Sequence, residues 1–206
     1  VDSWKEVTLI YNAALRQMET KMEILNDEFQ HVHQYNPIEH IKARIKTPES
    51  IVKKLKKDGY ESNIPNMIRY VNDIAGIRII CSFVDDIYEV AEMLVRQDDV
   101  TVIAIKDYIK NPKPNGYRSY HMIIEIPVFF SDSKKPIRVE VQIRTIAMDF
   151  WASLDHQLKY KKSFVDLNGE ISGELKQCAD VIAQTDNKML EIRKRIEAQG
   201  VTVSRD

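Results

Sequence analysis

Apolar side chains recur every three or four positions along the first 35 residues, which is the spacing of one face of an α-helix. The recurring positions are Val7, Tyr11, Ala14, Met18, Met22, Leu25, Phe29 and Val32. The run ends where the chain reads Tyr35-Asn36-Pro37, because proline disfavours helix in the residue before it. The pattern therefore predicts one long amphipathic helix over residues 1–35.

Shorter strands and helices follow. Thr47 can cap a helix that begins at Pro48 and ends at Gly59. Strands are predicted at about 76–83, 100–106, 120–130 and 137–145, with a helix at about 85–97 between the first two. Because the hydrophobic faces of these strands need helices over them, we expect an α/β (α+β) fold with a mixed β-sheet flanked by helices.

The C-terminal part is again helical. Residues 145–160 predict a helix that carries Trp151, and residues 161–169 predict a linker. In the final helix apolar or small residues alternate at spacings of four and three: Ile171, Leu175, Cys178, Ile182, Thr185, Met189, Ile192 and Ile196. Such a seam needs a partner helix. The partner can be the chain's own domain or a second chain, and we favour self-assembly because neither terminal helix is needed to build the sheet.

This pattern divides the chain into an N-terminal helix (1–35), a central domain (36–162) and a C-terminal helical segment (163–206). No stretch approaches the roughly 18 continuous apolar residues of a membrane span, and the N-terminus lacks a signal-peptide pattern. We therefore expect a cytoplasmic protein without a membrane partner. Cys81 and Cys178 have neither metal nor disulfide spacing, and we expect both to be buried.

Charge is balanced over the whole chain but clustered locally. The net charge is −1 over 206 residues, yet residues 42–57 hold seven Lys or Arg against one acid, Glu49. A local basic patch favours a small anionic ligand over duplex nucleic acid, which needs a broader basic face.

A second basic segment contains aromatic residues. Residues 106–121 hold four cations, three tyrosines and a histidine around a Pro-Asn-Gly turn, with one acid among them. Cations bind phosphate, and an aromatic ring can stack on any base. This composition fits a nucleotide site, although a solvated basic loop would look the same.

The strand predicted at 137–145 places four charged or polar residues on one face, namely Arg138, Glu140, Gln142 and Arg144, with apolar residues on the other. An ordinary solvent-facing strand shows the same alternation. Taken with the tyrosine-rich loop, the polar face is better interpreted as the floor of a site in which Glu140 is the only acid.

Several motifs in order resemble the synthetase domain of the RelA/SpoT homologue family. They are Arg44-Ile-Lys46-Thr-Pro-Glu-Ser50-Ile-Val-Lys-Lys54, Asp73-Ile-Ala-Gly-Ile-Arg78, Asn115-Gly-Tyr-Arg-Ser-Tyr-His121, Glu140-Val-Gln-Ile-Arg-Thr145, and the segment from Ala147 to His156. The chain is short, so it resembles a small alarmone synthetase, RelP-like in the segment before Arg44. The resemblance implies a nucleotidyltransferase-like fold for residues 36–162 and a homotetramer built through the terminal helices.

The resemblance also implies an activity, which is GTP diphosphokinase. Such enzymes transfer pyrophosphate from ATP to the 3′-hydroxyl of GTP or GDP and release AMP, making (p)ppGpp for the stringent response. Residues at the family's ATP positions are Arg44, Lys46, Ser50, Lys54 and Arg78. Arg44 and Arg78 match the pair that sandwiches adenine, and Lys46, Ser50 and Lys54 match positions that hold ATP phosphates.

By the same resemblance, Asp73 and Glu140 are the catalytic carboxylates and the ligands of Mg²⁺, which prefers a few protein oxygens with water and phosphate. Glu140 is also the best-placed general base. Residues at the family's GTP/GDP positions are Lys106, Tyr108, Lys113, Asn115, Tyr117, His121 and Gln142. Tyr117 matches the tyrosine that stacks on guanine, and Arg118 can belong with this group.

Two other functions stay open at this point. The chain can be a binding protein, either a catalytically weak alarmone sensor or a single-stranded RNA binder that uses the tyrosine-lysine loop. It can also be a nucleotidyltransferase that transfers a nucleoside monophosphate and releases pyrophosphate in place of AMP. The sequence leaves the choice of acceptor among GDP, GTP and GMP undecided.

Overall fold

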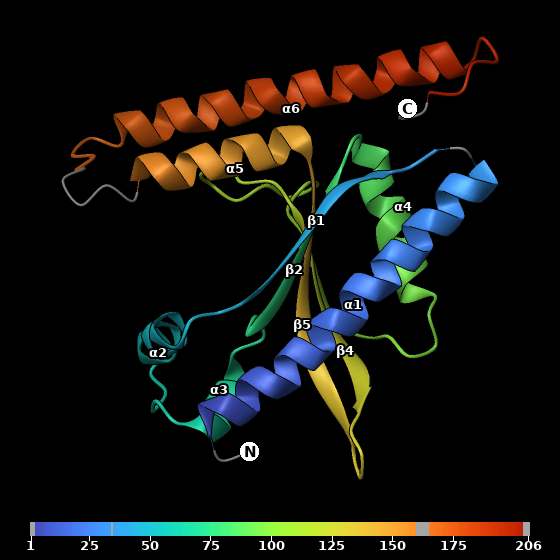
Figure 1. The fold of residues 1–206 in the computed structure, drawn as a ribbon. Helices are drawn as coiled ribbons and strands as arrows, with labels where there is room; N and C mark the ends of the chain where they lie inside the picture. Colours follow the sequence, from blue (N-terminus) through green and yellow to red (C-terminus); the bar gives the residue numbers. More distant parts are fainter. Residues whose placement is uncertain (1–2, 34, 160–164, 204–206) are drawn as a thin grey trace.

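The computed structural model describes residues 3–33, 35–159 and 165–203. In chain order the elements are α1 (Trp4–His33), β1 (Ile38–Ile45), α2 (Pro48–Lys57), α3 (Ile64–Tyr70), β2 (Ala75–Cys81), α4 (Val84–Val95), β3 (Thr101–Asp107), β4 (Tyr120–Phe129), β5 (Lys134–Thr145), α5 (Ile146–Lys159) and α6 (Glu170–Glu197). The predicted mixed sheet flanked by helices, with long helices at both ends, is confirmed (Figure 1).

The five strands are ordered β1-β2-β5-β4-β3. β2 and β5 are parallel, and the other three pairs are antiparallel. The sequence analysis missed β1 and α3. In β1 the register shifts between Ile38 and His40. This irregularity places Glu39 and His40 consecutively at the surface, which breaks the strict alternation that reveals a strand.

One face of the sheet packs against α1 and α4, and this side forms the core. Helix α1 contacts β1, β2, β4 and β5, and α4 contacts β2 and β5. Five of the residues predicted on the apolar face of α1 are buried, and Ile10 and Leu15 are buried beside them: Val7, Tyr11, Ala14, Met18 and Met22. Val32, which was also predicted on this face, is 61% exposed. Since α1 and α4 take one face, side chains of alternate strand residues on the other face remain available for a site.

Helix α5 continues directly from the end of β5 and packs beside α6 (Figure 1). The indole Nε1 of Trp151 donates to the Leu175 carbonyl at 2.8 Å, so Trp151 is structural, as its position in the predicted helix suggested. Helix α6 buries Ala179, Asp186 and Arg193. This buried row is one residue away from the predicted apolar seam.

Most of that seam faces solvent in the single chain. Met189 is 52% exposed, and Ile171, Ile192 and Ile196 are each between 38% and 41% exposed. Cys81 is buried as expected, but the prediction that Cys178 is buried is wrong, because Cys178 is exposed on the same side of α6. Within the described residues, every helix is too short or too polar to cross a membrane.

Candidate active site

One row of polar side chains crosses all five strands on the face opposite α1. The hydrogen-bonding register aligns Lys42, Arg78, Gln142, His121 and Lys106, taken in order from β1 to β3. Three of these five positions were predicted as nucleotide-binding residues on the acceptor side and one on the donor side. The register thus brings together residues that are separated by up to 100 positions in the sequence.

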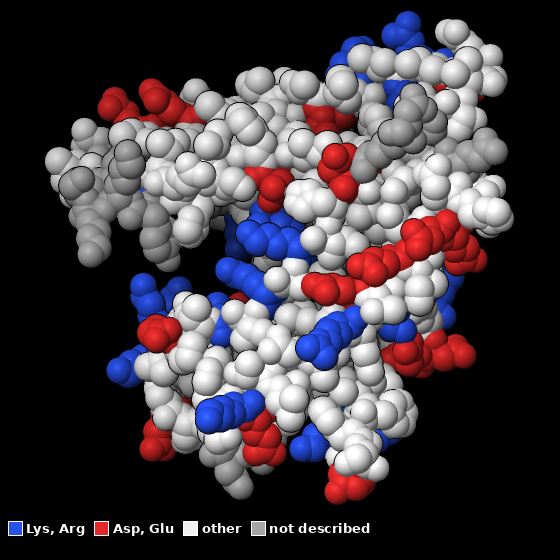
Figure 2. All heavy atoms as spheres, in the orientation of Figure 1, with Lys and Arg blue, Asp and Glu red and all other residues white. Residues whose placement is uncertain are grey.

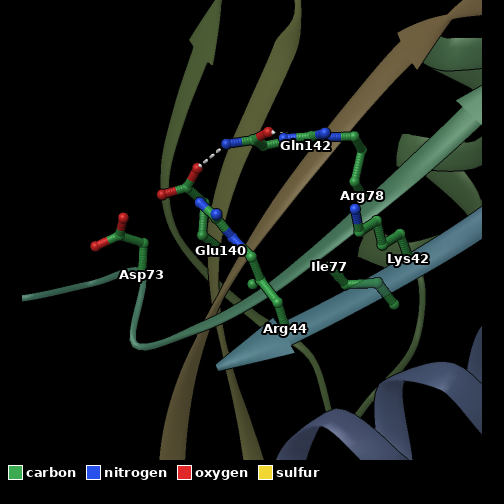
Figure 3. A pocket seen from close by; sticks show the side chains of 8 residues that line it. Lys42, Arg44, Asp73, Ile77, Arg78, Glu140 and Gln142 are labelled. Atoms are coloured by element: carbon green, nitrogen blue, oxygen red, sulfur yellow. Dashed lines mark hydrogen bonds between the residues drawn. The ribbon is translucent and has the colours of Figure 1, made fainter. Parts of the chain in front are cut away.

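A second row lies two residues away from the first, later on β1 and earlier on β2 and β5. It aligns Arg44 of β1 with Gly76 of β2 and Glu140 of β5. These residues line a cavity together with Lys42, Asp73, Ile77, Arg78 and Gln142. Figure 3 shows Arg44 reaching from β1 towards Glu140, with the Asp73 carboxylate facing the same space from the loop before β2.

Arg44 and Arg78 are diagonal neighbours across the antiparallel β1-β2 pair, since Arg44 lies opposite Gly76. Diagonal neighbours on one face of a sheet are about 7–8 Å apart. That spacing accommodates one planar ring between two guanidinium groups. The position of the pair therefore suits a base held between Arg44 and Arg78.

Asp73 is held by two lysines. Lys46 Nζ lies 3.0 Å from Asp73 Oδ2, and Lys54 Nζ lies 2.8 Å from Asp73 Oδ1. Burial raises the pKa of Asp73, but the hydrogen bonds and charges of Lys54 and Lys46 outweigh it, so its pKa lies below the ordinary value. Asp73 is therefore a carboxylate anion that is paired with two lysine ammonium groups. Ser50 is exposed in the first turn of α2, where its hydroxyl accepts a hydrogen bond from the Thr47 cap.

Gln142 connects the two halves of the site. Its Nε2 donates to Glu140 Oε1 at 2.6 Å, and its Oε1 accepts from Arg78 Nε at 3.4 Å and from an Arg144 nitrogen at 3.1 Å. Arg144 also donates to the Tyr117 hydroxyl at 2.7 Å. A chain of hydrogen bonds thus runs from Arg78 on the donor side to Tyr117 on the acceptor side, with Glu140 beside its centre.

Tyr117 is half-buried among aromatic and cationic groups. Its hydroxyl lies 2.8 Å from His121 Nε2, and the Lys113 ammonium lies 4.9 Å from the Tyr117 ring centre. The Tyr108 ring packs edge-on against both Tyr117 and His121. Asn115 accepts a hydrogen bond from the Tyr117 amide, which holds the turn that presents the ring.

His121 is a neutral group in this setting. Burial, together with the positive charges of Arg144, Lys113, Lys106 and Arg78, lowers its pKa to about 3. Its Nδ1 lies 3.9 Å from Glu140 Oε1, a distance at which only a protonated imidazole would form an ion pair. Because the imidazole is neutral, that approach is not a salt bridge.

The chain is similar to known proteins over nearly its whole length. The model of the region found in RelA/SpoT proteins matches residues 43–164. GTP pyrophosphokinase YwaC of Bacillus subtilis is 46% identical over 197 residues, covering 96% of this chain and 93% of YwaC. The chain belongs to the RelA/SpoT family. Within this family it is a small alarmone synthetase, and the prediction of a RelP-like member is confirmed.

Solved structures of small alarmone synthetases share the whole fold. Small alarmone synthetase 2 of B. subtilis superposes with a TM-score of 0.83 at 46% identity, covering 93% of this chain and 98% of that protein. Small alarmone synthetase 1 of B. subtilis, solved with its product pppGpp, gives 0.85 at 34% identity, covering 94% and 97% of the two chains. The same enzyme has been solved with AMPCPP, with a TM-score of 0.78, 30% identity and coverage of 95% and 99%.

In this synthetase the site opens onto a basic hollow. Figure 2 shows Lys and Arg side chains gathered around a depression between the α5–α6 layer and the α2 side of the sheet. The neighbouring elements supply the cations that line the cavity itself: Lys42, Arg44 and Arg78. Lys106 is exposed on β3 at the end of the transverse row.

Three residues of the site, Lys42, Gly76 and Asp149, were not singled out from the sequence, and Arg144 was placed on the polar face of its strand without a role of its own. Arg144 is 4% exposed and bonds Ser119, Gln142, Tyr117 and Asp149. Asp149 of α5 contacts Arg144 at 3.1 Å and lies 3.7 Å from Arg78. The alternation on β5 predicted that Arg144 shares the face of Glu140, but it did not reveal the partners of Arg144. Lys42 is placed by the register of β1, which was not recognised as a strand, and Gly76 is placed by the pairing of β2 with β5.

Proposed function

We propose that this cleft performs the reaction of the small alarmone synthetases with the residues described above. The chain is a GTP pyrophosphokinase, making (p)ppGpp from ATP and GTP or GDP. The observation that supports the residue roles best is the position of Glu140. It lies beside Gln142, which hydrogen-bonds to residues of both the donor side and the acceptor side. A group at this point is within reach of both substrates.

ATP occupies the β1-β2 side in this proposal. Its adenine lies between Arg44 and Arg78, because guanidinium planes stack on bases and keep their charge. Its phosphates lie towards Lys46, Lys54 and the start of α2, where Ser50 is exposed and the helix N-terminus favours negative charge. A relative bound to AMPCPP, which carries a similar triphosphate chain, supports a donor site in this fold.

The acceptor occupies the β4 side. Its guanine stacks on Tyr117, while Tyr108, Asn115 and His121 surround the base. Lys106, Lys113 and Gln142 are close enough to this side to bind the ribose or the phosphates. The relative bound to its product pppGpp supports an acceptor site in this fold.

Mg²⁺ is the cation that the family implies, and the residues fit it. Asp73 and Glu140 line one cavity from different elements, and a pair of carboxylates is enough for Mg²⁺, which completes its shell with water and phosphate oxygens. The described residues hold no cluster of three or more metal-binding side chains, so the proposal rests on this pair of carboxylates alone. When bound, the ion would neutralise charge on the transferred phosphates.

The side chains of the protein align the two substrates and remove the proton of the attacking 3′-hydroxyl. Attack by the 3′-hydroxyl on the β-phosphorus needs the two substrates to approach in line. The Gln142 network sets the distance between the donor and acceptor sides, and Glu140 accepts the hydroxyl proton. Lys46 and Lys54 then balance the negative charge that Asp73 shares with the phosphates.

The products decide among the candidate functions. Incubation of the pure protein with ATP, GDP or GTP, and Mg²⁺ should yield AMP and a 3′-pyrophosphorylated guanosine nucleotide. Release of pyrophosphate in place of AMP would indicate a nucleotidyltransferase. Salt-sensitive binding of single-stranded RNA without Mg²⁺ dependence would indicate a binding protein. The chain keeps Asp73 and Glu140 at the two carboxylate positions of the family motifs, which favours an enzyme over a binding protein that has lost its activity.

Self-assembly is part of the proposal. Helix α5 exposes an apolar stripe at one-turn spacing, formed by Ile146, Phe150, Leu154 and Leu158, and each of these side chains is at least 39% exposed. With the exposed seam of α6, this stripe fits a homo-oligomer, a homotetramer by family resemblance, in the cytoplasm where both nucleotides are found. Light scattering should give four times the mass of 24.0 kDa, and Phe150→Asp should lower it.

A further inference from the structure

The turn that carries Tyr117 rests directly on helix α6. Gly116 has φ of +96°, a conformation that favours glycine. A Cβ atom added to Gly116 would lie only 2.7 Å from Ala179 Cβ and 3.4 Å from Lys176 Cα. The turn can therefore occupy this position only because position 116 lacks a side chain and position 179 has a small one.

Arg118 fastens the same turn to the same helix. One guanidinium nitrogen donates to the Gly116 carbonyl at 3.2 Å, and another donates to Asp180 Oδ1 at 3.0 Å. Arg118 does not line the cavity between Arg44 and Glu140. From the sequence, Arg118 was only a possible member of the guanosine-binding group, and in the structure its guanidinium group bonds to Asp180 of α6 and to the Gly116 carbonyl.

The ion pair between Arg118 and Asp180 contributes little to the stability of the whole fold, and its main effect is to fix the position of the Tyr117 turn. The Asp180 side chain is 41% exposed, and ion pairs of such exposure add little to the free energy of folding. Gly116, however, is bonded directly to Tyr117, whose amide is held by Asn115. A shift of Gly116 away from Ala179 therefore moves the Tyr117 ring relative to His121 and Gln142.

We propose that Arg118 and Asp180 are positioning residues for the acceptor nucleotide, which hold the turn at residues 115–117 against α6 so that Tyr117 faces the guanine. The inference rests on the proposed function, because it assumes that Tyr117 binds the acceptor. It makes the acceptor side, and not the donor side, dependent on the placement of α6.

The test is a double-mutant cycle of Arg118 and Asp180 in which KM for GDP and KM for ATP are measured separately. Arg118→Ala and Asp180→Ala should each raise KM for GDP about five-fold, in the range of one coupled pair, with KM for ATP unchanged. The double variant should be no worse than either single variant. Binding of a fluorescent GDP analogue, measured without ATP, should weaken by the same factor and gives a readout independent of turnover.

Glu191→Ala is the matched control, since Glu191 is an acid on the same helix paired with the exposed Lys188 at 3.3 Å. It should leave both Michaelis constants unchanged. The charge-exchanged variant Arg118→Asp with Asp180→Arg should recover part of the lost GDP affinity.

Two results would overturn the inference while leaving the function intact. One is a normal KM for GDP in Asp180→Ala beside a raised KM in Arg118→Ala, which would mean that Arg118 binds nucleotide directly. The other is a double variant whose losses multiply. Failure of the wild-type protein to produce AMP from ATP and GDP would instead remove the proposed function itself.

Discussion

Gly76 of β2 lies opposite Glu140 of β5 in the parallel pair, and its missing side chain leaves the floor of the cavity open. The fold does not need glycine at this position. A Cβ atom at Gly76 would meet nothing closer than the Arg44 carbonyl oxygen at 4.0 Å, and its φ is not in the left-handed region. We therefore infer that glycine is present at position 76 because a side chain there would fill the space proposed for the donor nucleotide.

We predict that Gly76→Val folds normally but loses ATP binding. The valine would project between Arg44 and Glu140, where the donor nucleotide is proposed to lie, and valine is favoured in strands. Thermal unfolding should give an unchanged or higher midpoint, while ATP affinity measured by calorimetry should fall at least about ten-fold. A folded variant that binds ATP like the wild type would show that the cavity floor is not the donor site. An unfolded variant would instead contradict the conclusion that the fold does not need glycine at position 76.

The pairing of Lys54 with Asp73 leads to a second prediction. Both oxygens of Asp73 are bonded to lysines, so a divalent cation that binds this carboxylate competes with two ammonium groups for its negative charge. Lys54→Met should therefore bind Mn²⁺ more tightly than the wild type without nucleotide. It should also bind ATP about ten-fold more weakly, because a charge-assisted hydrogen bond is lost.

Electron paramagnetic resonance of free Mn²⁺ measures the first effect and calorimetry measures the second. Lys56→Met, which removes an exposed lysine of the same helix, serves as the control and should change neither. If Lys54→Met binds Mn²⁺ no better than the wild type, Lys54 and the cation do not compete for Asp73.

Much of the fold could be predicted from the sequence because most elements follow one clear period. The buried face of α1 and the alternation of β5 are examples, and the predicted β4 and β5 contain or overlap the observed strands. β1 could not be predicted because its irregularity puts Glu39 and His40 side by side. Without β1, the sequence could not predict that Lys42 and Arg44 lie beside Arg78 and Gly76 in the site.

The candidate site could be predicted as a set of residues but not as a network. The motifs identify Glu140, Gln142 and Tyr117 individually. Arg144 could be placed on the polar face of its strand, but the bonds by which it joins Gln142 to Tyr117 depend on the antiparallel β4-β5 register and on the path of the loop. Long-range pairing of this kind carries no local signal in a single sequence.

Tyr117 offers a third prediction, in which ring and hydroxyl are tested separately. Tyr117→Phe keeps the stacking surface and loses only the hydrogen bonds to His121 and Arg144, so KM for GDP should change less than about five-fold. Tyr117→Ala should lose about 1–3 kcal/mol of stacking and raise KM for GDP accordingly. Equal effects of the two variants on steady-state KM would contradict a stacking role.

The contact between α6 and α4 gives a fourth prediction, on stability. Arg193 bonds Asp85 and lies 3.4 Å from Asp86, whose side chain is 1% exposed. Burial, together with the Asp85 charge, raises the pKa of Asp86 to about 6, against the opposite effects of the Tyr35 hydrogen bond and Arg193. Removing the arginine would leave Asp86 buried without its cation.

Arg193→Met should therefore lower the free energy of unfolding by about 3 kcal/mol, measured by urea denaturation. Arg195→Met, at an exposed position two residues further along α6, should cost less than about 0.5 kcal/mol. Similar losses in the two variants would mean that the buried cluster does not anchor α6.

The low pKa of His121 makes a fifth prediction, on pH dependence. Its folded-state pKa of about 3 lies below the value of about 6.5 in an unfolded chain. Between these values the unfolded state binds more protons, so stability falls as pH decreases from 6.5 towards 3. His121→Gln should therefore lose less stability than the wild type when the pH drops from 7 to 4.5. Urea midpoints at both pH values measure the difference. Asp86 titrates in the same pH window in the opposite sense, but it is present in both proteins, so its contribution cancels.

His33→Gln, at an exposed histidine at the end of α1, is the control and should keep the pH dependence of the wild type. If His121→Gln also shows the wild-type pH dependence, His121 is protonated in the folded site.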